Sequence, residues 1–227
     1  MTEIELHNTE GRIIPGDNTT ILRPPHSHPW VVGLLYQDET LGERIGCGGT
    51  LIGEHQKHVL TAAHCIDEDP PIIGDYVVVG EHNQNDPNDG QEKIKVINKM
   101  AHPKWVPHVG DYDLAILELE KGVTNPLAKS ALLPKEGDMF EKYIVDGWGD
   151  AVADIDDHSP SHILRTIILS DIQPNDDTPG ADRACRGINY ELHICGANLT
   201  LPIMSIGGGD SGGILSVNYS SCILRIF

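Results

Sequence analysis

The chain has 227 residues, enough for one large all-β domain or two smaller ones with a sizeable core. Its 16 basic and 34 acidic residues give a formal net charge of −18, which repels phosphate backbones and anionic lipid. We therefore expect no nucleic-acid partner. We also expect no membrane span, because the sequence contains no apolar run of about 18 residues.

Short apolar runs separated by Gly, Pro, Asn and Asp predict many short β-strands. In chain order the clearest are WVVGLLY (30–36), YVVVGE (76–81), IKVIN (94–98), LAILEL (114–119) and YIVDGW (143–148). Helical periodicity is limited to about one turn around Thr61–His64. The pattern is typical of an antiparallel barrel or sandwich, with exposed acidic loops at 67–75, 83–92 and 150–160.

The cysteines favour an oxidising compartment. The five are Cys47, Cys65, Cys185, Cys195 and Cys222. They show no CxxC spacing of a zinc site, and their odd number leaves one thiol over if the others pair. Three N-x-[ST] sequons are compatible with secretion, although the first twelve residues lack the basic end and apolar stretch of a signal peptide.

The strongest local motif is Gly-Asp-Ser-Gly-Gly at 209–213. Its glycines let the backbone turn sharply, so that the N–H groups of Gly209 and Ser211 could meet at one point and stabilise an oxyanion. Ser211 would then be the nucleophile. The alternative is a tight turn with no chemical role.

Two upstream motifs offer partners for this serine. Thr-Ala-Ala-His-Cys at 61–65 holds His64, which could accept the serine proton as a general base. Asp113 stands at the mouth of the apolar strand at 114–119, where its carboxylate could hold the imidazole in one tautomer and orientation. Taken singly, a histidine is usually structural and a carboxylate that opens a strand is usually surface.

Together the motifs TAAHC, DLAIL, GWG (147–149) and GDSGG, in that order, resemble the trypsin-like (chymotrypsin-fold) serine protease family from about Arg12 to Leu215. The resemblance implies an all-β fold of two packed antiparallel six-stranded Greek-key barrels. Residues 13–125 would form the N-terminal barrel carrying His64 and Asp113, and residues 126–227 the C-terminal barrel carrying Ser211. It also implies a secreted endopeptidase that cleaves protein or peptide substrates through an acyl-enzyme and requires no cofactor.

The resemblance extends to activation. Residues 1–12 would be the remnant of an activation peptide, which an activating protease removes by cutting after Arg12. The new ammonium of Ile13 would then pair with the carboxylate of Asp210 and order the oxyanion hole. By the same resemblance Cys47 would bond Cys65, and Cys185 would bond Cys195; Cys222 would remain without a partner.

Two further expectations concern ligands. The segment 81–92 stands where many relatives bind calcium, and Glu81, Asn83, Asp86 and Glu92 would supply oxygen ligands; a solvated acidic loop is the alternative. Ser205 resembles the floor of the primary specificity pocket. Because that floor is neutral, we expect an apolar or aromatic side chain before the scissile bond.

Departures from the family pattern leave a second functional class open. Gly207 replaces a usual cysteine and Ile214 a usual proline, and the chain ends at Phe227, only a short way beyond the serine. We therefore expect the second barrel to be incomplete. The alternative function is a non-catalytic protease homologue, or an incomplete fragment, that acts as a binding module.

Overall fold

The computed structural model describes residues 24–40, 42–67, 73–107, 111–135, 138, 141–149, 160–172, 194–197, 210–213, 215–218 and 221–223. Within these residues the fold is built almost entirely from strands, so the expected all-β class is confirmed. A single helical turn, α1 (His64–Asp67), follows the third strand.

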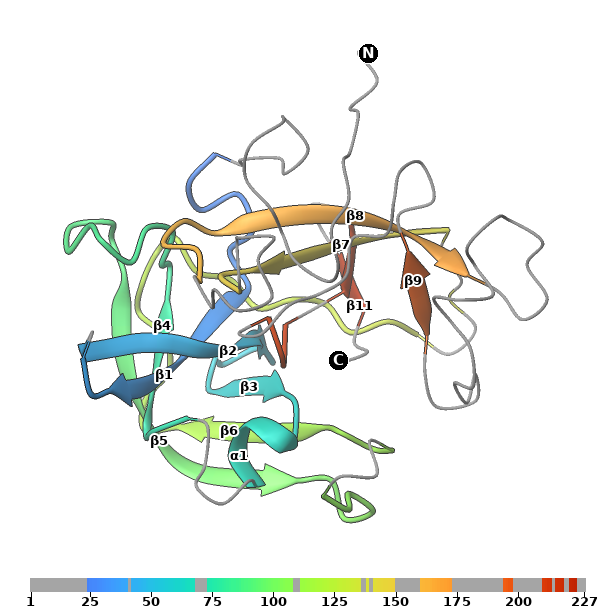
Figure 1. Ribbon diagram of the computed structural model, residues 1–227, viewed down its shortest axis with the longest axis horizontal. Coiled ribbons are helices and arrows are strands. Elements are labelled where there is room, and N and C mark those ends of the chain that lie inside the picture. Colours follow the sequence, from blue (N-terminus) through green and yellow to red (C-terminus); the bar gives the residue numbers. More distant parts are fainter. Residues whose placement is uncertain are drawn as a thin grey trace.

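The first six strands close into an antiparallel barrel (Figure 1). They are β1 (Val31–Asp38), β2 (Gly42–Ile52), β3 (His58–Thr61), β4 (Tyr76–Val79), β5 (Glu92–Ala101) and β6 (Ala115–Leu119). Around the barrel the order is β1-β2-β3-β6-β5-β4, and β4 returns to pair with β1. Closure leaves no unpaired strand edge in this part of the chain.

Alternation of apolar and polar residues builds the barrel core. In β6 the side chains of Ala115, Leu117 and Leu119 are fully buried, whereas those of Ile116 and Glu118 between them are partly exposed. The same face is completed by apolar side chains of the other strands, including Val32, Leu34, Leu51, Val59, Val77 and Ile94. The strand periodicity of the sequence therefore decides which face lies inward.

The remaining described strands form an open five-stranded sheet. They are β7 (Lys142–Gly147), β8 (Arg165–Ile172), β9 (Cys195–Ala197), β10 (Leu215–Asn218) and β11 (Ser221–Ile223), in the order β11-β10-β7-β8-β9. The described residues thus contain one closed barrel and one open sheet. The second six-stranded barrel and the Greek-key connections remain expectations.

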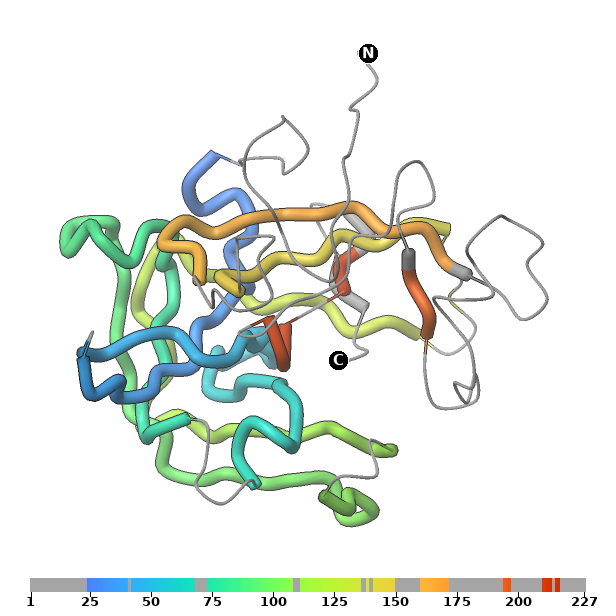
Figure 2. Tube along the Cα trace, viewed as in Figure 1, coloured from blue at the N-terminus to red at the C-terminus, as the bar shows by residue number. Residues whose placement is uncertain are grey.

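Barrel and sheet lie side by side in the trace (Figure 2), and an apolar seam joins them. Its buried side chains are Trp30, Val31, Leu35, Ile45, Val78, Ala131, Trp148 and Leu164. The loop after β4 adds backbone hydrogen bonds to the segment before β8: Gln84 N–H donates to His162 O at 2.8 Å, and Leu164 N–H donates to His82 O at 2.8 Å. This seam positions the sheet against the barrel.

Candidate active site

The pairing of β3 with β6 brings His64 and Asp113 together. Thr61 lies opposite Ala115 in this antiparallel pair, at the end where β3 leaves the barrel and β6 enters it. His64 follows three residues after Thr61, and Asp113 precedes Ala115 by two. Residues that lie 49 positions apart along the chain therefore share one edge of the barrel.

Two contacts fix the imidazole of His64. Its backbone N–H donates to Asp113 Oδ1 at 2.8 Å, and its ring Nδ1 lies 2.5 Å from Asp113 Oδ2. The two side chains are 20% and 15% exposed, so this pair is sheltered from water on most sides. A carboxylate on Nδ1 favours the tautomer with the proton there, which leaves Nε2 able to accept a proton.

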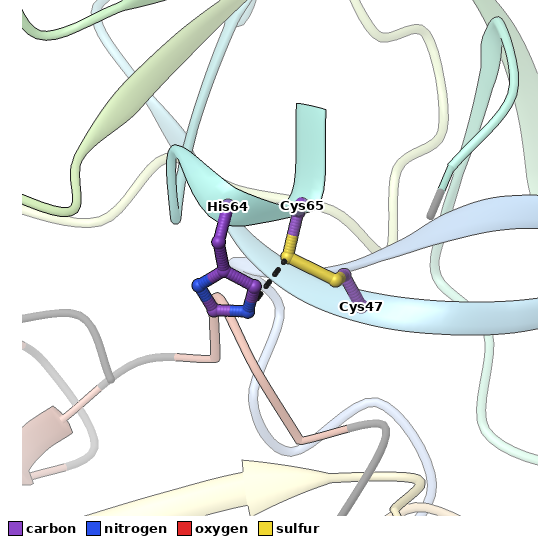
Figure 3. Close-up of side chains that lie close together, drawn as sticks. All are labelled: Cys47, His64 and Cys65. Carbon is purple, nitrogen blue, oxygen red and sulfur yellow. Dashed lines mark hydrogen bonds between the residues drawn. A yellow bond between two sulfur atoms is a disulfide. The ribbon is translucent and has the colours of Figure 1, made fainter. Parts of the chain in front are cut away.

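The His64 ring lies beside a disulfide (Figure 3). Cys47 of β2 and Cys65 of α1 are bonded, the pairing expected from the sequence, with Cα atoms 6.4 Å apart. Ring atom Nε2 is 3.7 Å from Cys65 Sγ. These three residues are the one group of potential metal-ligand side chains that converges within the described parts of the chain, but both sulfurs are used by the disulfide. The disulfide therefore supports the histidine and offers no metal site.

A strained backbone turn directly before Asp113 sets the direction of its side chain. The preceding residue, Tyr112, has φ 58°, in the left-handed region that a bulky side chain rarely adopts. Leu114 N–H donates to Tyr112 O at 2.7 Å, which closes the turn. The Tyr112 ring stacks on His102 with ring centres 5.0 Å apart, so tertiary packing holds the strained conformation.

The serine loop is docked on the same barrel edge. Ser211 O accepts from Gly48 N–H at 2.7 Å, which ties the loop to β2. Gly212 has φ 74°, and a Cβ atom there would lie 2.3 Å from Thr61 Oγ1 and 2.6 Å from Gly48 O. Only glycine fits this close approach. Ser211 itself is partly exposed, next to the strand end that leads to His64.

Asp210 explains the two glycines of the GWG motif. Its side chain is 1% exposed, and its Oδ1 accepts from Gly149 N–H at 2.8 Å. A Cβ atom on Gly147 would lie 2.0 Å from Asp210 Oδ1, and one on Gly149 would lie 2.4 Å from the carboxyl carbon. The motif thus leaves room for a buried carboxylate beside the candidate nucleophile, a relation that the sequence did not reveal.

Several expected site residues lie outside the described residues: Arg12, Ile13, Cys185, Ser205 and Gly209. Cys195 is disulfide-bonded, but its pairing with Cys185 stays a prediction. Roles in activation, the oxyanion hole and the specificity pocket also stay predictions for these positions.

Three of the four expected calcium ligands carry hydrogen bonds within the protein. Both oxygens of Glu92 are engaged by the segment after β6: Oε1 accepts from Lys121 and from the Thr124 hydroxyl, and Oε2 accepts from the backbone N–H groups of Thr124 and Asn125. Asn83 Oδ1 and Asp86 Oδ1 accept from backbone N–H groups two residues further along. These hydrogen bonds order the loop, and calcium binding by Glu81, Asn83, Asp86 and Glu92 stays a prediction.

Asp89, which the sequence analysis did not single out, organises this loop. Its Oδ2 accepts from the backbone N–H groups of His82 and Asn83. Burial, and then the charge and hydrogen bond of Asp89, raise the pKa of Glu81 to about 7. Burial also lowers the pKa of His82 below its ordinary value, although the negative charge of Asp89 acts to raise it. The loop thus concentrates titratable groups close to the seam.

A second histidine–aspartate pair escaped the sequence analysis. His28 Nδ1 lies 2.6 Å from Asp146 Oδ2, and both side chains are almost fully buried. The Thr166 hydroxyl donates to the other oxygen of Asp146 at 2.5 Å, and the His28 ring stacks on Trp30. The pair links the segment before β1 to β7. It lies among buried side chains, so it is a structural contact and not a second reactive site.

Comparison with known proteins places this arrangement in a family. The family model described as Trypsin matches residues 19–219. Chymotrypsin-like elastase family member 1 of Macaca fascicularis is 39% identical over 110 residues, which cover 45% of this chain and 39% of the relative. Mast cell protease 2 of Ovis aries is 31% identical over 212 residues, which cover 90% of this chain and 76% of the relative.

The solved structure "Structure of GrC" has a TM-score of 0.67 at 22% identity, and the match covers 89% of this chain and 84% of that one. At this identity the likeness shows the fold, which is chymotrypsin-like. The matched region of the macaque relative is less than two thirds of its length. The chain belongs to the trypsin family of serine proteases. The described part of the chain contains no helix with the length and apolarity to cross a bilayer.

Proposed function

We propose that this protein is a serine endopeptidase that hydrolyses internal peptide bonds through an acyl-enzyme. The contact between His64 Nδ1 and Asp113 Oδ2 carries the proposal, because it is the arrangement that orients a general base toward a serine. The Ser211 loop supports it, since its backbone is bonded to the barrel edge from which His64 projects.

In the proposed reaction Ser211 Oγ attacks the carbonyl carbon of the substrate while His64 Nε2 takes the hydroxyl proton. Asp113 stabilises the imidazolium that forms. The N–H groups of Gly209 and Ser211 would hold the oxyanion, and His64 would return the proton to the departing amine. Water then attacks the acyl-enzyme in the same way and releases the acid. The reaction requires no cofactor.

Activation is part of the proposal. Cleavage after Arg12 by an activating protease would free Ile13, whose ammonium would reach the buried carboxylate of Asp210. A carboxylate at 1% exposure is costly unless it is compensated by charge or hydrogen bonds. An ammonium at this point would order residues 210–213 and with them the backbone that binds the oxyanion.

The proposed substrates are proteins or peptides with an apolar or aromatic residue before the cut, because Ser205, which by resemblance would form the floor of the primary pocket, carries no negative charge. An extracellular location suits the disulfides and the proposed zymogen.

The test is covalent labelling of Ser211. The chain is cut after Arg12, exposed to a fluorophosphonate, and the labelled peptide is identified by mass spectrometry. We expect label on Ser211, and none in the His64→Ala variant or in the uncut chain. A folded, correctly cut protein that takes no label would overturn the proposal and leave the binding homologue as the function.

A further inference from the structure

The candidate active site takes its reactive residues from two parts of the molecule. His64 and Asp113 lie at one edge of the barrel, whereas Ser211 lies in residues 210–213, the serine loop, which leads into β10 of the open sheet. The position of the candidate nucleophile relative to the candidate base therefore depends on how the sheet is oriented against the barrel.

The apolar seam attracts the sheet to the barrel but gives the contact little direction. Its buried side chains, among them Trp30 before β1 and Trp148 after β7, interact through non-directional contacts. Apolar cores tolerate repacking when their total volume is kept. A polar contact within the same junction has stricter geometry, because its donor and acceptor must meet at a fixed distance and angle.

His28 and Asp146 form such a polar contact. His28 stands three residues before the start of β1, and Asp146 lies in β7. His28 Nδ1 is 2.6 Å from Asp146 Oδ2, and the two side chains are 1% and 0% exposed. The Thr166 hydroxyl of β8 donates to the other carboxylate oxygen, and the His28 ring stacks on Trp30 with ring centres 5.7 Å apart. One carboxylate therefore joins the start of the barrel to two strands of the sheet.

The same stretch of β7 lies against the serine loop. β7 pairs with β10, into which the loop leads. A Cβ atom on Gly213 would lie 3.3 Å from Asp146 O, and one on Gly147 would lie 2.0 Å from Asp210 Oδ1. The backbone of Asp146 and Gly147 thus contacts both ends of the serine loop. A shift of β7 relative to the barrel would carry Ser211 with it.

We propose that His28 and Asp146 are positioning residues, whose contact fixes the orientation of the sheet against the barrel and so sets the position of Ser211 relative to His64. The inference rests on the proposed function and names two residues that serve it without contacting the substrate. Apolar replacement of a buried polar pair is often neutral for stability, whereas a polar pair can specify one arrangement of its neighbours. The pair should therefore contribute more to catalytic geometry than to the free energy of unfolding.

The main experiment replaces the polar group by apolar side chains, with His28→Phe, Asp146→Leu and Thr166→Val in one chain. Parent and variants are cut after Arg12. We expect a Tm within about 5 °C of the parent, because no single member is left buried without the others. We expect kcat for a chromogenic peptide with Phe before the cut to fall by about tenfold or more, with KM nearly unchanged. Ile94→Val, in the barrel core, is the control for lost stability and should keep the parent's kcat.

A second comparison covers poor folding of the triple variant. His28→Asn and His28→Leu introduce side chains of similar size, but only the Asn amide can donate a hydrogen bond to Asp146. Both leave space beside Trp30 and should lower Tm. We expect the Asn variant to keep kcat within about threefold of the parent and the Leu variant to lose about tenfold. Equal kcat in these two variants would contradict the positioning role.

Amide hydrogen exchange gives a readout that does not require activity. Gly48 N–H donates to Ser211 O at 2.7 Å across the junction, and Leu119 N–H donates to Lys57 O at 2.8 Å within the barrel. In the triple variant we expect Gly48 to exchange about tenfold faster relative to Leu119 than in the parent. Unchanged relative exchange, or an unchanged kcat, would overturn this inference. A parent chain that takes no fluorophosphonate label would instead overturn the proposed function, and exchange at Gly48 would then still decide whether the pair orients the sheet.

Discussion

At the scale of single residues, the candidate active site depends on glycine positions, which leave space for neighbouring groups, as much as on the reactive side chains. Asp210 can be buried because two neighbouring positions carry no side chain. The Ser211 turn can approach β2 because Gly212 has none. These glycines react with nothing, but they set where the reactive side chains lie.

Gly147→Ala should therefore reduce activity strongly. The new Cβ would lie 2.0 Å from Asp210 Oδ1, and the three nearest atoms all belong to that buried side chain, which would have to be displaced. We expect a loss of about 1–3 kcal/mol in the free energy of unfolding and at least a hundredfold loss in kcat/KM. Peptide hydrolysis and chemical unfolding measure the two effects. Gly42→Ala is the control for activity alone: its φ of 78° means that alanine costs some stability, but no atom lies within 4 Å of its Cβ, so activity should survive.

Asp113→Asn tests the orientation of the imidazole. The amide keeps the shape but offers the wrong partner to Nδ1 of His64, so the unproductive tautomer becomes favoured. We expect kcat to fall by about four orders of magnitude, as in well-studied triads of this family, with little change in KM. Activity within tenfold of the parent would mean that another group orients His64.

At the scale of elements, a side chain can join strands that do not pair at that point. Glu92 opens β5, yet its carboxylate is held by the segment that follows β6. Burial alone would raise the pKa of Glu92, but the hydrogen bonds from Lys121, Thr124 and Asn125 outweigh it and lower the pKa below its ordinary value. The ionised form is the one that stabilises the fold.

Stability should therefore depend on pH through Glu92. Because the pKa is lower in the folded chain than in the unfolded one, the contribution is present above the ordinary pKa of about 4.5 and is lost as pH falls through the folded value. We expect Glu92→Gln to cost about 1–2 kcal/mol at pH 7, with the difference from the parent shrinking as pH falls below the ordinary pKa of 4.5 toward the lower folded value. Urea unfolding at several pH values measures it.

Glu43→Gln is the control for this prediction. Glu43 pairs with Lys93, but both side chains are about 40% exposed, so the pair contributes little. A pH dependence of the same size in both variants would contradict the role given to Glu92.

At the scale of the whole molecule, one apolar seam joins the barrel to the sheet. Leu164 lies in it with 7% exposure, just before β8. Leu164→Ala should cost about 2–5 kcal/mol and should loosen the sheet against the barrel. Thermal unfolding measures the loss. Leu132→Ala, at a side chain that is 65% exposed, should be nearly neutral, and equal losses would contradict the importance of the seam.

The barrel could be read from the sequence because its strands are local patterns. The run LAILEL predicts β6 and its buried face without knowledge of any partner. Family motifs then identify His64, Asp113 and Ser211 as candidates. The pairing of Thr61 with Ala115, which brings the first two together, is a long-range contact that no local period encodes.

The same limit explains what the sequence did not predict. His28 and Asp146 are 118 residues apart, and nothing near either one indicates that they meet in the interior. The sequence offers Glu92 as an oxygen donor of its loop, but it does not show that Lys121 and Asn125 donate hydrogen bonds to this carboxylate. The sequence motifs likewise do not show how far the second sheet closes, since closure depends on strands distant in sequence.

The strained backbone of Tyr112 links the geometry of the candidate active site to the stability of the protein. Its left-handed backbone costs roughly 1–2 kcal/mol, which glycine would avoid. Tyr112→Gly should therefore relieve strain but lose the stacking on His102 that steadies the turn before Asp113. Selection for thermal stability alone would favour glycine at position 112. Selection for catalytic turnover would favour tyrosine, because it steadies the turn before Asp113. At this position thermal stability and turnover therefore oppose each other.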